Sequence, residues 1–330
     1  MRRSFRWAAP LALGALLAVS ACAATEAEGE ELVAEDVLVT AFEVPGPGIA
    51  PAGAPNRLGS ATVPVRSYEP GGGIEPWATL VWAHGGSFMR GTLDWPEADW
   101  VSRSFAAAGM RVISVDYVLA SETVKAPAPS NDVAAVLSWA GSEYAGPLVA
   151  GGASAGAHLA VLATLDQRDA NPGRAADALL LEYPTLHRVQ RADPRIADAA
   201  AALPEARRFR ADRISEMYDF YLGEPAPGVA PGAPGAAGQP AAVVAGELPP
   251  ERLAQLPPTI IVNADADELR ASGEEFAEQL RSAGVRVVES IEPDTVHGYL
   301  NRPEESATSR AQSAATIERF VGELRGIVSN

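Results

Sequence analysis

Short apolar runs alternate with helical stretches from Ala78 to the C-terminal end of the sequence. The predicted strands are 78–83, 111–116, 147–151, 178–183, 259–263 and 285–291, and the predicted helices are 98–108, 131–139, 157–165, 272–283 and 307–327. Two earlier runs, 37–44 and 62–68, are expected to be leading strands. Such alternation predicts an α/β fold, in which helices cover both faces of a mostly parallel sheet.

One interval interrupts this alternation and predicts an insertion at about 185–255. It contains a helical stretch at 212–222 and a tract rich in Pro, Gly and Ala at 225–240. A connection of that length is usually a lid or a segment without fixed structure. We interpret the helical part as a cap over the functional site. The tract is either a mobile excursion or a compositional insertion without a role.

An excess of acidic residues limits the classes of partner. The 330 residues carry a formal net charge of −16, with a pI near 4.7. Nucleic-acid binding requires a basic surface, so this charge argues against it. The hydrophobic content of 47% suffices for one large core, and a single α/β domain over 36–330 accounts for it.

The first residues have the pattern of an export signal. Arg2 and Arg3 are followed by an apolar stretch at 7–19, which is shorter than the roughly 20 residues of a membrane span. Small residues come next, as at a cleavage site. We therefore expect 1–21 to be a cleaved signal peptide and the protein to be exported.

Cys22 is the only cysteine, and it ends a Val-Ser-Ala-Cys segment that resembles the lipobox of bacterial lipoproteins. The resemblance implies a lipid on Cys22 that anchors the protein to the outer face of the cell membrane. The acidic, Ala-rich segment 22–35 is then a disordered tether. The alternative is an ordinary secretory signal that is cut near Ala23, which would leave the protein freely secreted.

A Gly-x-Ser-x-Gly segment, 152–156, directly follows a predicted strand and precedes a predicted helix. This strand, turn and helix are the context in which such a segment forms a nucleophile elbow. The turn brings main chain close to main chain, so small flanking residues are required. Ser154 is therefore a candidate nucleophile. A hydroxyl needs a base, and the base needs a carboxylate, so we expect a histidine and an acid further along the chain.

A second glycine-containing loop, 84–88, follows the predicted strand 78–83. Backbone N–H groups in such a loop stabilise the oxyanion of an acyl-transfer transition state by roughly 3–4 kcal/mol each. His84 is expected to hold the loop rather than to act as a base. The expected oxyanion hole consists of backbone amides from Gly85, Gly86, Ser87 and Ala155.

Six ordered motifs resemble those of the hormone-sensitive-lipase-like branch of α/β-hydrolases, which contains bacterial family IV esterases and acetyl esterases. They are the 84–88 loop, SVDYVLASE at 114–122, DVAAVLSW at 132–139, GGASAGAHLA at 151–160, LPPTIIVNADADELR at 256–270 and VHGYL at 296–300. The match runs from about residue 65 to the C-terminus. The resemblance implies an α/β-hydrolase fold with a mostly parallel central sheet, flanking helices and a helical cap.

Carried over residue by residue, the resemblance assigns the acid to Asp267 and the base to His297. The resulting order Ser, Asp, His is the one that this fold uses. Asp265 and Asp294 are the competing acids, and both fit turn positions more simply. The remaining histidines, His158 and His187, are expected to be structural or to lie on the surface.

Four positions depart from the family pattern: Val118, Ser121, Ser87 before Phe88, and Ala153 before the nucleophile. None removes a catalytic group, but each leaves the substrate open. The apolar cap and loop residues expected near the substrate are Phe88, Met217, Tyr218, Tyr221 and Tyr299, and ordinary helix packing is the alternative for those at 217–221.

The predicted function is that of a serine carboxylic-ester hydrolase acting on small-molecule, short-chain acyl esters through an acyl-enzyme. The resemblance implies no metal and no organic cofactor. An arylformamidase-like amidohydrolase and a non-catalytic surface-binding relative are the alternatives. The sequence sets no oligomeric state.

Overall fold

Eight strands form one sheet in the order β1-β2-β4-β3-β5-β6-β7-β8. The structure is a computed structural model that describes residues 37–48, 59–223 and 244–329. β2 is antiparallel to its neighbours β1 and β4. All the other neighbouring pairs in this order, from β4-β3 to β7-β8, are parallel. The strands are β1 (Leu38–Pro45), β2 (Thr62–Glu69), β3 (Thr79–Ala83), β4 (Arg111–Val115), β5 (Leu148–Ala153), β6 (Ala178–Glu182), β7 (Thr259–Ala266) and β8 (Val287–Val296). The predicted α/β fold is confirmed.

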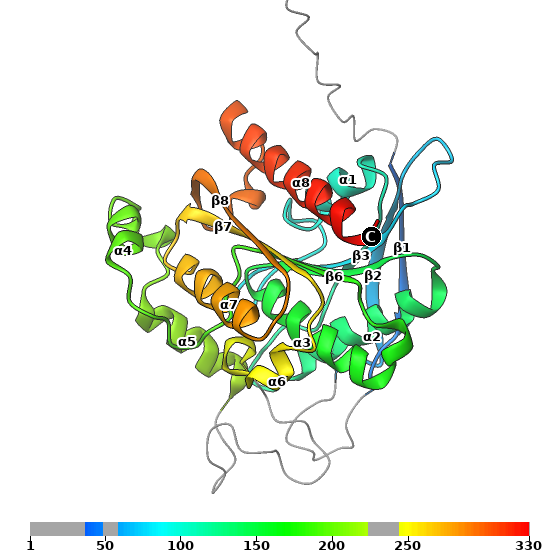
Figure 1. The fold of residues 1–330 in the computed structure, drawn as a ribbon, viewed down its shortest axis with the longest axis horizontal. Helices are drawn as coiled ribbons and strands as arrows, with labels where there is room; N and C mark the ends of the chain where they lie inside the picture. The colour runs from blue at the N-terminus through cyan, green and yellow to red at the C-terminus, as the bar shows by residue number, and fades with distance from the viewer. Residues whose placement is uncertain (1–36, 49–58, 224–243, 330) are drawn as a thin grey trace, which may run out of the picture. The chain divides into compact units, whose positions relative to one another are not determined.

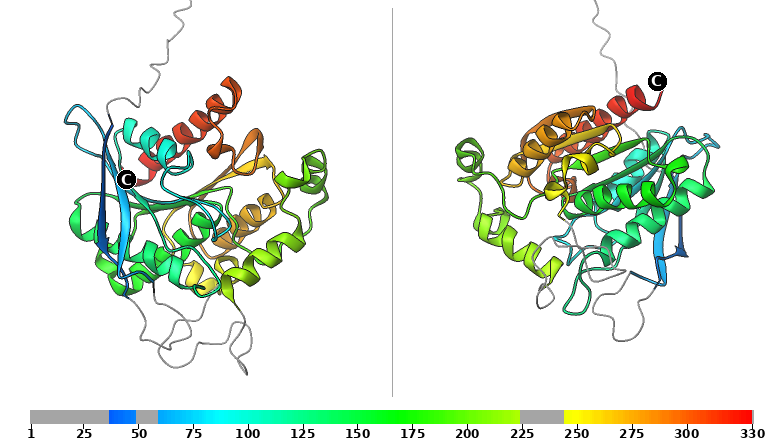
Figure 2. Two further views of the ribbon diagram at one scale, coloured as in Figure 1. Left: turned by 180° about the vertical axis from the view of Figure 1, so that it is seen from behind. Right: turned by 60° about the horizontal axis from the view of Figure 1, so that its bottom comes forward.

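Helices cover both faces of this sheet (Figure 1). The two on one face are α1 (Asp99–Ala107) and α8 (Ala307–Val328), which contact each other. The three on the other face are α2 (Ala128–Glu143), α3 (Ala155–Ala170) and α7 (Arg270–Ser282). The two further views in Figure 2 show the same layers from behind and from below.

The parallel strands are apolar along their whole length because both faces of the sheet are covered. In β3, Leu80 and Trp82 belong to the core cluster that includes α1 and α8, whereas Val81 and Ala83 belong to the cluster that includes α2, α3 and α7. The period of two residues along a strand divides its side chains between the two layers. Both layers end at the carboxyl edge of the sheet, where the loops of the site begin.

The insertion at 185–255 contributes α4 (Pro194–Ala200), α5 (Ala211–Leu222) and α6 (Pro250–Leu253). The apolar side of α5 is buried, and Gly223, at φ 75°, ends the helix. Tyr221 of α5 stacks on Phe88, which follows β3, and Tyr218 donates a hydrogen bond to the carbonyl of Thr185, which follows β6. The helix predicted at 212–222 therefore lies over the carboxyl ends of these strands.

Several sequence predictions lie outside the described residues. These are the signal peptide 1–21, the lipidated Cys22, the tether 22–35 and the tract 225–240. Within the part that the structure describes, no helix has both the length and the apolar character needed to cross a membrane.

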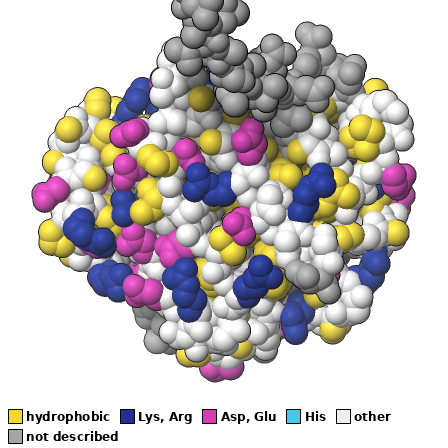
Figure 3. All heavy atoms as spheres, turned by 45° about the horizontal axis from the view of Figure 1, so that its top comes forward, with side chains coloured by type: hydrophobic (Ala, Val, Ile, Leu, Met, Phe, Trp, Pro, Cys, Tyr) yellow, Lys and Arg dark blue, Asp and Glu magenta, His cyan; other side chains and the backbone are white. Residues whose placement is uncertain are grey.

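Acidic and basic side chains are interspersed on the face of the molecule seen in Figure 3. Among the described residues many acidic side chains pair with arginines, such as Asp99 with Arg103 at 2.8 Å and Asp169 with Arg252 at 2.8 Å. On this face the acidic excess is therefore distributed among arginines and does not form a field of one sign.

Candidate active site

Ser154 lies on a strained turn between β5 and α3. Its backbone has φ 53° and ψ −116°, outside the regions that L-residues favour. A Cβ atom at Gly152 would lie 2.5 Å from the backbone of Gly156, and one at Gly156 would lie 2.0 Å from the carbonyl oxygen of Ala83. The two glycines therefore allow the close backbone approach that exposes a serine at the top of the sheet.

A continuous hydrogen-bonded chain joins the three residues that the family resemblance selects. Ser154 Oγ lies 2.9 Å from His297 Nε2, and His297 Nδ1 lies 2.7 Å from Asp267 Oδ2. An ionised carboxylate only accepts hydrogen bonds, so Nδ1 carries the proton and Nε2 accepts from the serine hydroxyl. The side chain of Asp267 is fully buried and that of His297 is 8% exposed, which strengthens the electrostatic interaction between them.

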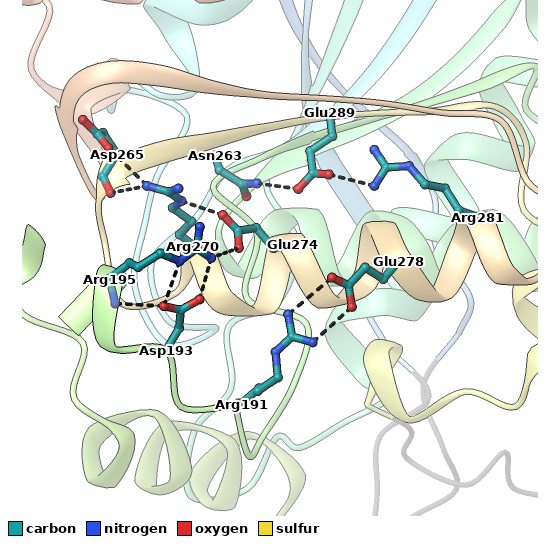
Figure 4. A network of polar contacts seen from close by, with 10 residues as sticks. All are labelled: Arg191, Asp193, Arg195, Asn263, Asp265, Arg270, Glu274, Glu278, Arg281 and Glu289. Carbon is teal, nitrogen blue, oxygen red and sulfur yellow. Dashed lines mark hydrogen bonds and ion pairs between the residues drawn. The ribbon is translucent and has the colours of Figure 1, made fainter. Parts of the chain in front are cut away.

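The loop that carries Asp267 is held by its own backbone and by Arg270. Asp267 Oδ1 accepts a hydrogen bond from the N–H of Leu269 at 3.0 Å. Figure 4 shows Arg270 between Asp265 and Glu274, with hydrogen bonds of 3.1 and 2.8 Å. Asp265 also accepts from the N–H of Asp294 at 3.2 Å, so it links the loop of the acid to the loop that precedes His297. The two competing acids thus have places in the scaffold of these loops.

The loop after β3 takes a conformation that leaves backbone N–H groups unpaired. Gly86, Ser87 and Phe88 all have positive φ, at 119°, 56° and 65°. A Cβ atom at Gly86 would lie 1.9 Å from the carbonyl oxygen of Arg90, so only glycine fits there. Among the described residues, no hydrogen bond uses the N–H of Gly86, Ser87 or Ala155. Their amides are therefore available as donors near Ser154.

Gly85 differs from its neighbours, and its predicted role as an oxyanion donor is wrong. Its N–H donates to Oε2 of the buried Glu97 at 2.5 Å. An amide that already has a buried carboxyl acceptor points away from the space where an oxyanion forms. Gly85 thus fixes the loop rather than binding the developing charge.

The other three histidines are buried and packed against aromatic or polar partners. His84 stacks on Tyr117 with 4.6 Å between ring centroids, and burial lowers the pKa of its imidazole. His158 Nδ1 lies 3.2 Å from the hydroxyl of Tyr218. His187 Nδ1 lies 2.9 Å from Ser272 Oγ, and burial lowers its pKa as well. The structure thus places all three in structural surroundings.

Three of the five predicted substrate contacts pack with one another, and a fourth is buried in the same core cluster. Phe88 stacks on Tyr221 at 3.9 Å with 13° between the rings, and it meets Tyr218 edge-on at 5.6 Å. Met217 belongs to the same core cluster and is 6% exposed. These side chains attach α5 to the oxyanion loop and have little surface left for a ligand.

Tyr299, the fifth, lies on the other side of the sheet. It is 5% exposed, belongs to the core cluster of α1 and α8, and its hydroxyl forms a short hydrogen bond with Thr316 of α8. The prediction of a substrate contact is therefore wrong at Tyr299. A short helical turn, Tyr299–Asn301, directs the ring into the core immediately after His297.

One residue of the site, Phe209, had no signal in the sequence. Phe209 packs on the imidazole of His297, and its N–H donates to Oε2 of Glu268 at 3.0 Å. Phe209 also lines a cavity of about 400 Å³ between α4, α5 and the start of α7, whose other apolar walls include Ile196 and Ile214. An aromatic residue between arginines in an insertion has no periodicity that could identify it.

The described residues include no group of three or more His, Cys, Asp or Glu side chains arranged to hold a metal ion. The groups that the site itself offers are a hydroxyl, an imidazole, a carboxylate and backbone amides. Together they are suited to nucleophilic acyl transfer.

Comparisons with known proteins agree with this geometry. A family model for the alpha/beta hydrolase fold matches residues 80–301. Carboxylesterase NlhH of Mycobacterium tuberculosis is 32% identical over 252 residues, which cover 74% of this chain and 73% of NlhH. Carboxylic ester hydrolase LipN of the same organism is 28% identical over 275 residues, which cover 80% of this chain and 64% of LipN.

Solved structures of esterases share the fold. A bacterial heroin esterase matches with a TM-score of 0.65 and 26% identity, covering 88% of this chain and 87% of that one. A hyperthermophilic esterase from the archaeon Pyrobaculum calidifontis matches with a TM-score of 0.67 and 27% identity, covering 86% of each chain. The chain therefore belongs to the α/β-hydrolase fold family, in its hormone-sensitive-lipase-like branch.

Proposed function

We propose that the protein is a serine carboxylic-ester hydrolase that acts on small esters with short acyl groups. The observation that carries this proposal is the hydrogen-bonded chain from Asp267 through His297 to Ser154. It ends beside three backbone amides without acceptors among the described residues. The similarity to the carboxylesterase NlhH, which covers 73% of that relative, supports the same reaction.

In the first half-reaction, Ser154 is the nucleophile and His297 is the general base. Nε2 of His297 takes the hydroxyl proton while Oγ attacks the ester carbonyl, and Asp267 stabilises the imidazolium. The amides of Gly86, Ser87 and Ala155 donate to the oxyanion. His297 then gives its proton to the leaving alcohol, and an acyl group remains on Ser154.

In the second half-reaction, water replaces the alcohol. His297 takes a proton from the water as it attacks the acyl carbonyl, and the same amides hold the second oxyanion. Collapse of this intermediate returns the proton to Oγ of Ser154 and releases the acid. No other reactant is needed.

The packing around the site favours short acyl groups. Phe88, Tyr218 and Tyr221 are fully buried against one another, so they offer no open groove for a long chain. The ring of Phe209, which packs on His297, lies between the imidazole and a cavity of about 400 Å³ that it also lines.

Labelling and turnover of the chain without residues 1–21 test the proposal. We expect hydrolysis of p-nitrophenyl acetate and covalent labelling of Ser154 by a fluorophosphonate, located by peptide mass spectrometry. Ser154→Ala should lose both and keep the circular dichroism spectrum of the parent protein. A parent protein that neither hydrolyses the ester nor reacts at Ser154 would refute the proposal.

We further propose that the protein is exported and anchored to the outer face of the membrane by a lipid on Cys22. The basic start, the short apolar stretch and the Val-Ser-Ala-Cys segment support this. Labelled palmitate should be incorporated into the full-length chain in a bacterial host and should be lost in Cys22→Ala. Incorporation that persists in Cys22→Ala, or none in the parent chain, would contradict lipidation at this residue.

A further inference from the structure

A buried carboxyl group lies directly behind the oxyanion loop. It belongs to Glu97, which precedes α1 and is 1% exposed. Its Oε2 accepts a hydrogen bond from the N–H of Gly85 and its Oε1 accepts one from the hydroxyl of Tyr183, each at 2.5 Å. Burial of a carboxyl group is costly unless hydrogen bonds compensate for the lost water, so these two donors define where the group sits.

The backbone of Glu97 is also held on both sides. Its N–H donates to Oδ1 of Asn301 at 3.1 Å, and its carbonyl oxygen accepts from Nε1 of Trp82 at 2.8 Å. Trp82 belongs to β3, which leads into the oxyanion loop, and Asn301 ends the short helical turn after His297. Glu97 is thus tied to the segments that carry the donors and the base.

Gly85 transmits the position of this carboxyl group to the nucleophile. A Cβ atom at Gly85 would lie 2.6 Å from Glu97 Oε2 and 3.0 Å from the Cβ of Ser154. The peptide of Gly85 is therefore packed tightly between Glu97 and Ser154. Because Gly86 and Ser87 follow directly, a shift of the carboxyl group shifts the amides that face the reaction.

Tyr183 connects the carboxyl group of Glu97 to the base, His297. Its ring meets the imidazole of His297 edge-on, with 4.8 Å between the centroids. Its φ of 30° is strained for a bulky residue. Two hydrogen bonds hold it in place: its N–H donates to the carbonyl of Val262 at 2.7 Å and its hydroxyl donates to Glu97.

We infer that Glu97 is a positioning residue that sets the oxyanion amides and the imidazole of His297 at their working distance, an inference that rests on the proposed ester hydrolysis. It acts through Gly85 and Tyr183 and does not touch the substrate. The amides contribute mainly in the transition state, so their displacement lowers kcat much more than it raises KM.

Three substitutions test this role. Glu97→Ala removes both acceptors and should lower kcat for p-nitrophenyl acetate by about 100-fold, the scale of one misplaced group, with KM within about twofold. Tyr183→Phe removes one bond and should cost about tenfold in kcat. Glu97→Gln can still accept from Gly85 and donate to the oxygen of Tyr183, so it should retain more activity than Glu97→Ala.

Tyr68→Phe is the matched control. The buried hydroxyl of Tyr68 donates to Oδ1 of Asp99 at 2.8 Å, two residues beyond Glu97 but away from the oxyanion loop. This variant loses the same kind of bond, so it should have the thermal stability of Tyr183→Phe and the kcat of the parent enzyme. The affinity for a trifluoromethyl ketone, which mimics the tetrahedral intermediate, should fall in step with kcat/KM at Glu97 and Tyr183 only.

Several outcomes would overturn the inference. They are full kcat in the Tyr183→Phe variant, an equal loss in Tyr68→Phe, and a rise in KM at constant kcat. The first of these decides the matter even if Glu97→Ala does not fold. An active parent enzyme with any of these results contradicts only the role of Glu97, whereas an inactive parent enzyme contradicts the proposed function together with it.

Discussion

The ring of Phe209 lies against the imidazole of His297, with 4.4 Å between the ring centroids and 59° between the ring planes. Glu268, in the loop that carries Asp267, holds Phe209 in place. The N–H of Phe209 donates to Glu268 Oε2 at 3.0 Å, and Arg208 Nε donates to Glu268 Oε1 at 2.8 Å. Glu268 directly follows Asp267. Adjacent carboxylates therefore orient the base and fix the ring that covers it.

Phe209→Ala should change the preference for acyl length. The ring separates His297 from the cavity of about 400 Å³, so its removal opens a path into an apolar space. Each methylene that enters such a space adds binding energy to the transition state. We expect the ratio of kcat/KM for p-nitrophenyl octanoate to that for the acetate to rise about tenfold, measured over a series of p-nitrophenyl esters.

Phe42→Ala controls for the loss of a half-buried phenylalanine. Phe42 lies on β1 and meets Trp139 edge-on at 5.5 Å, on an outer strand of the sheet. The ratio should stay at the parent value in this variant. An unchanged ratio in Phe209→Ala would show that the cavity takes no part in substrate binding.

Asp267→Asn should lower kcat by about 10⁴-fold. The amide can donate to Nδ1 of His297, so the imidazole takes the tautomer that cannot accept the proton of Ser154. Asp265→Asn is the matched control, because Asp265 lies two residues earlier and bonds Arg270 rather than the base. It should cost less than about tenfold, since Arg270 also bonds the carbonyl oxygen of residue 265. Steady-state hydrolysis of p-nitrophenyl acetate gives kcat for both variants. Equal losses of kcat in the two variants would contradict the assignment of Asp267 as the acid.

The ion pairs around α7 are expected to differ in their effect on kcat, and Figure 4 shows two arginines that can be compared. Arg270 is 13% exposed and joins Asp265 to Glu274, whereas Arg191 is 49% exposed and pairs with Glu278 at 3.1 Å. An exposed pair contributes roughly 0–1 kcal/mol, whereas a partly buried arginine with three hydrogen bonds contributes more. Arg270→Ala should lower kcat about tenfold because it loosens the loop of Asp267.

Arg191→Ala should leave kcat within about twofold and the free energy of unfolding within roughly 0.5 kcal/mol. Urea unfolding and ester turnover of the two variants give the comparison. A kcat that falls equally in both would mean that the network acts through the overall charge around α7, and that the contact of Arg270 with the acid loop has no separate effect.

The regular elements could be predicted because their signals are local. The helix predicted at 212–222 is α5 (Ala211–Leu222), and the one predicted at 307–327 is α8 (Ala307–Val328). The elbow was equally local, since glycines two residues on either side of Ser154 are required by contacts within a few residues and with β3. Boundaries differed where strands continue past their apolar core, as β7 does to Ala266.

Contacts across the sheet could not be predicted in this way. Glu97 and Tyr183 are 86 residues apart, and only the strand order brings them together. The glycine loop alone predicts Gly85 as an oxyanion donor, because no motif identifies Glu97 as the acceptor of its N–H. The position of Tyr299 two residues after His297 predicts a place near the substrate, but proximity in sequence does not give the direction of a side chain after a turn.

Glu182 should make the protein less stable as the pH rises. Burial raises the pKa of its carboxyl group well above the usual value; a hydrogen bond with Tyr299 opposes this shift, and the charges of Glu97 and Glu292 add to it. The folded state therefore binds a proton that the unfolded chain releases above about pH 4.5. The stability that this group contributes is complete below that pH and is lost as the pH rises toward its raised folded-state pKa.

Glu182→Gln removes the ionisable group and keeps its shape, so it should remove this loss. We expect Tm to exceed that of the parent protein by about 2–4 °C at pH 8, which corresponds to about 1 kcal/mol for a domain of this size, and to differ little at pH 5. Glu318→Gln on the exposed side of α8 should leave the difference between the two pH values unchanged. A Glu182→Gln variant that is less stable than the parent protein at pH 8 would mean that the ionised carboxylate is stabilised in the folded state, because the neutral isostere then loses an interaction that only the charge makes.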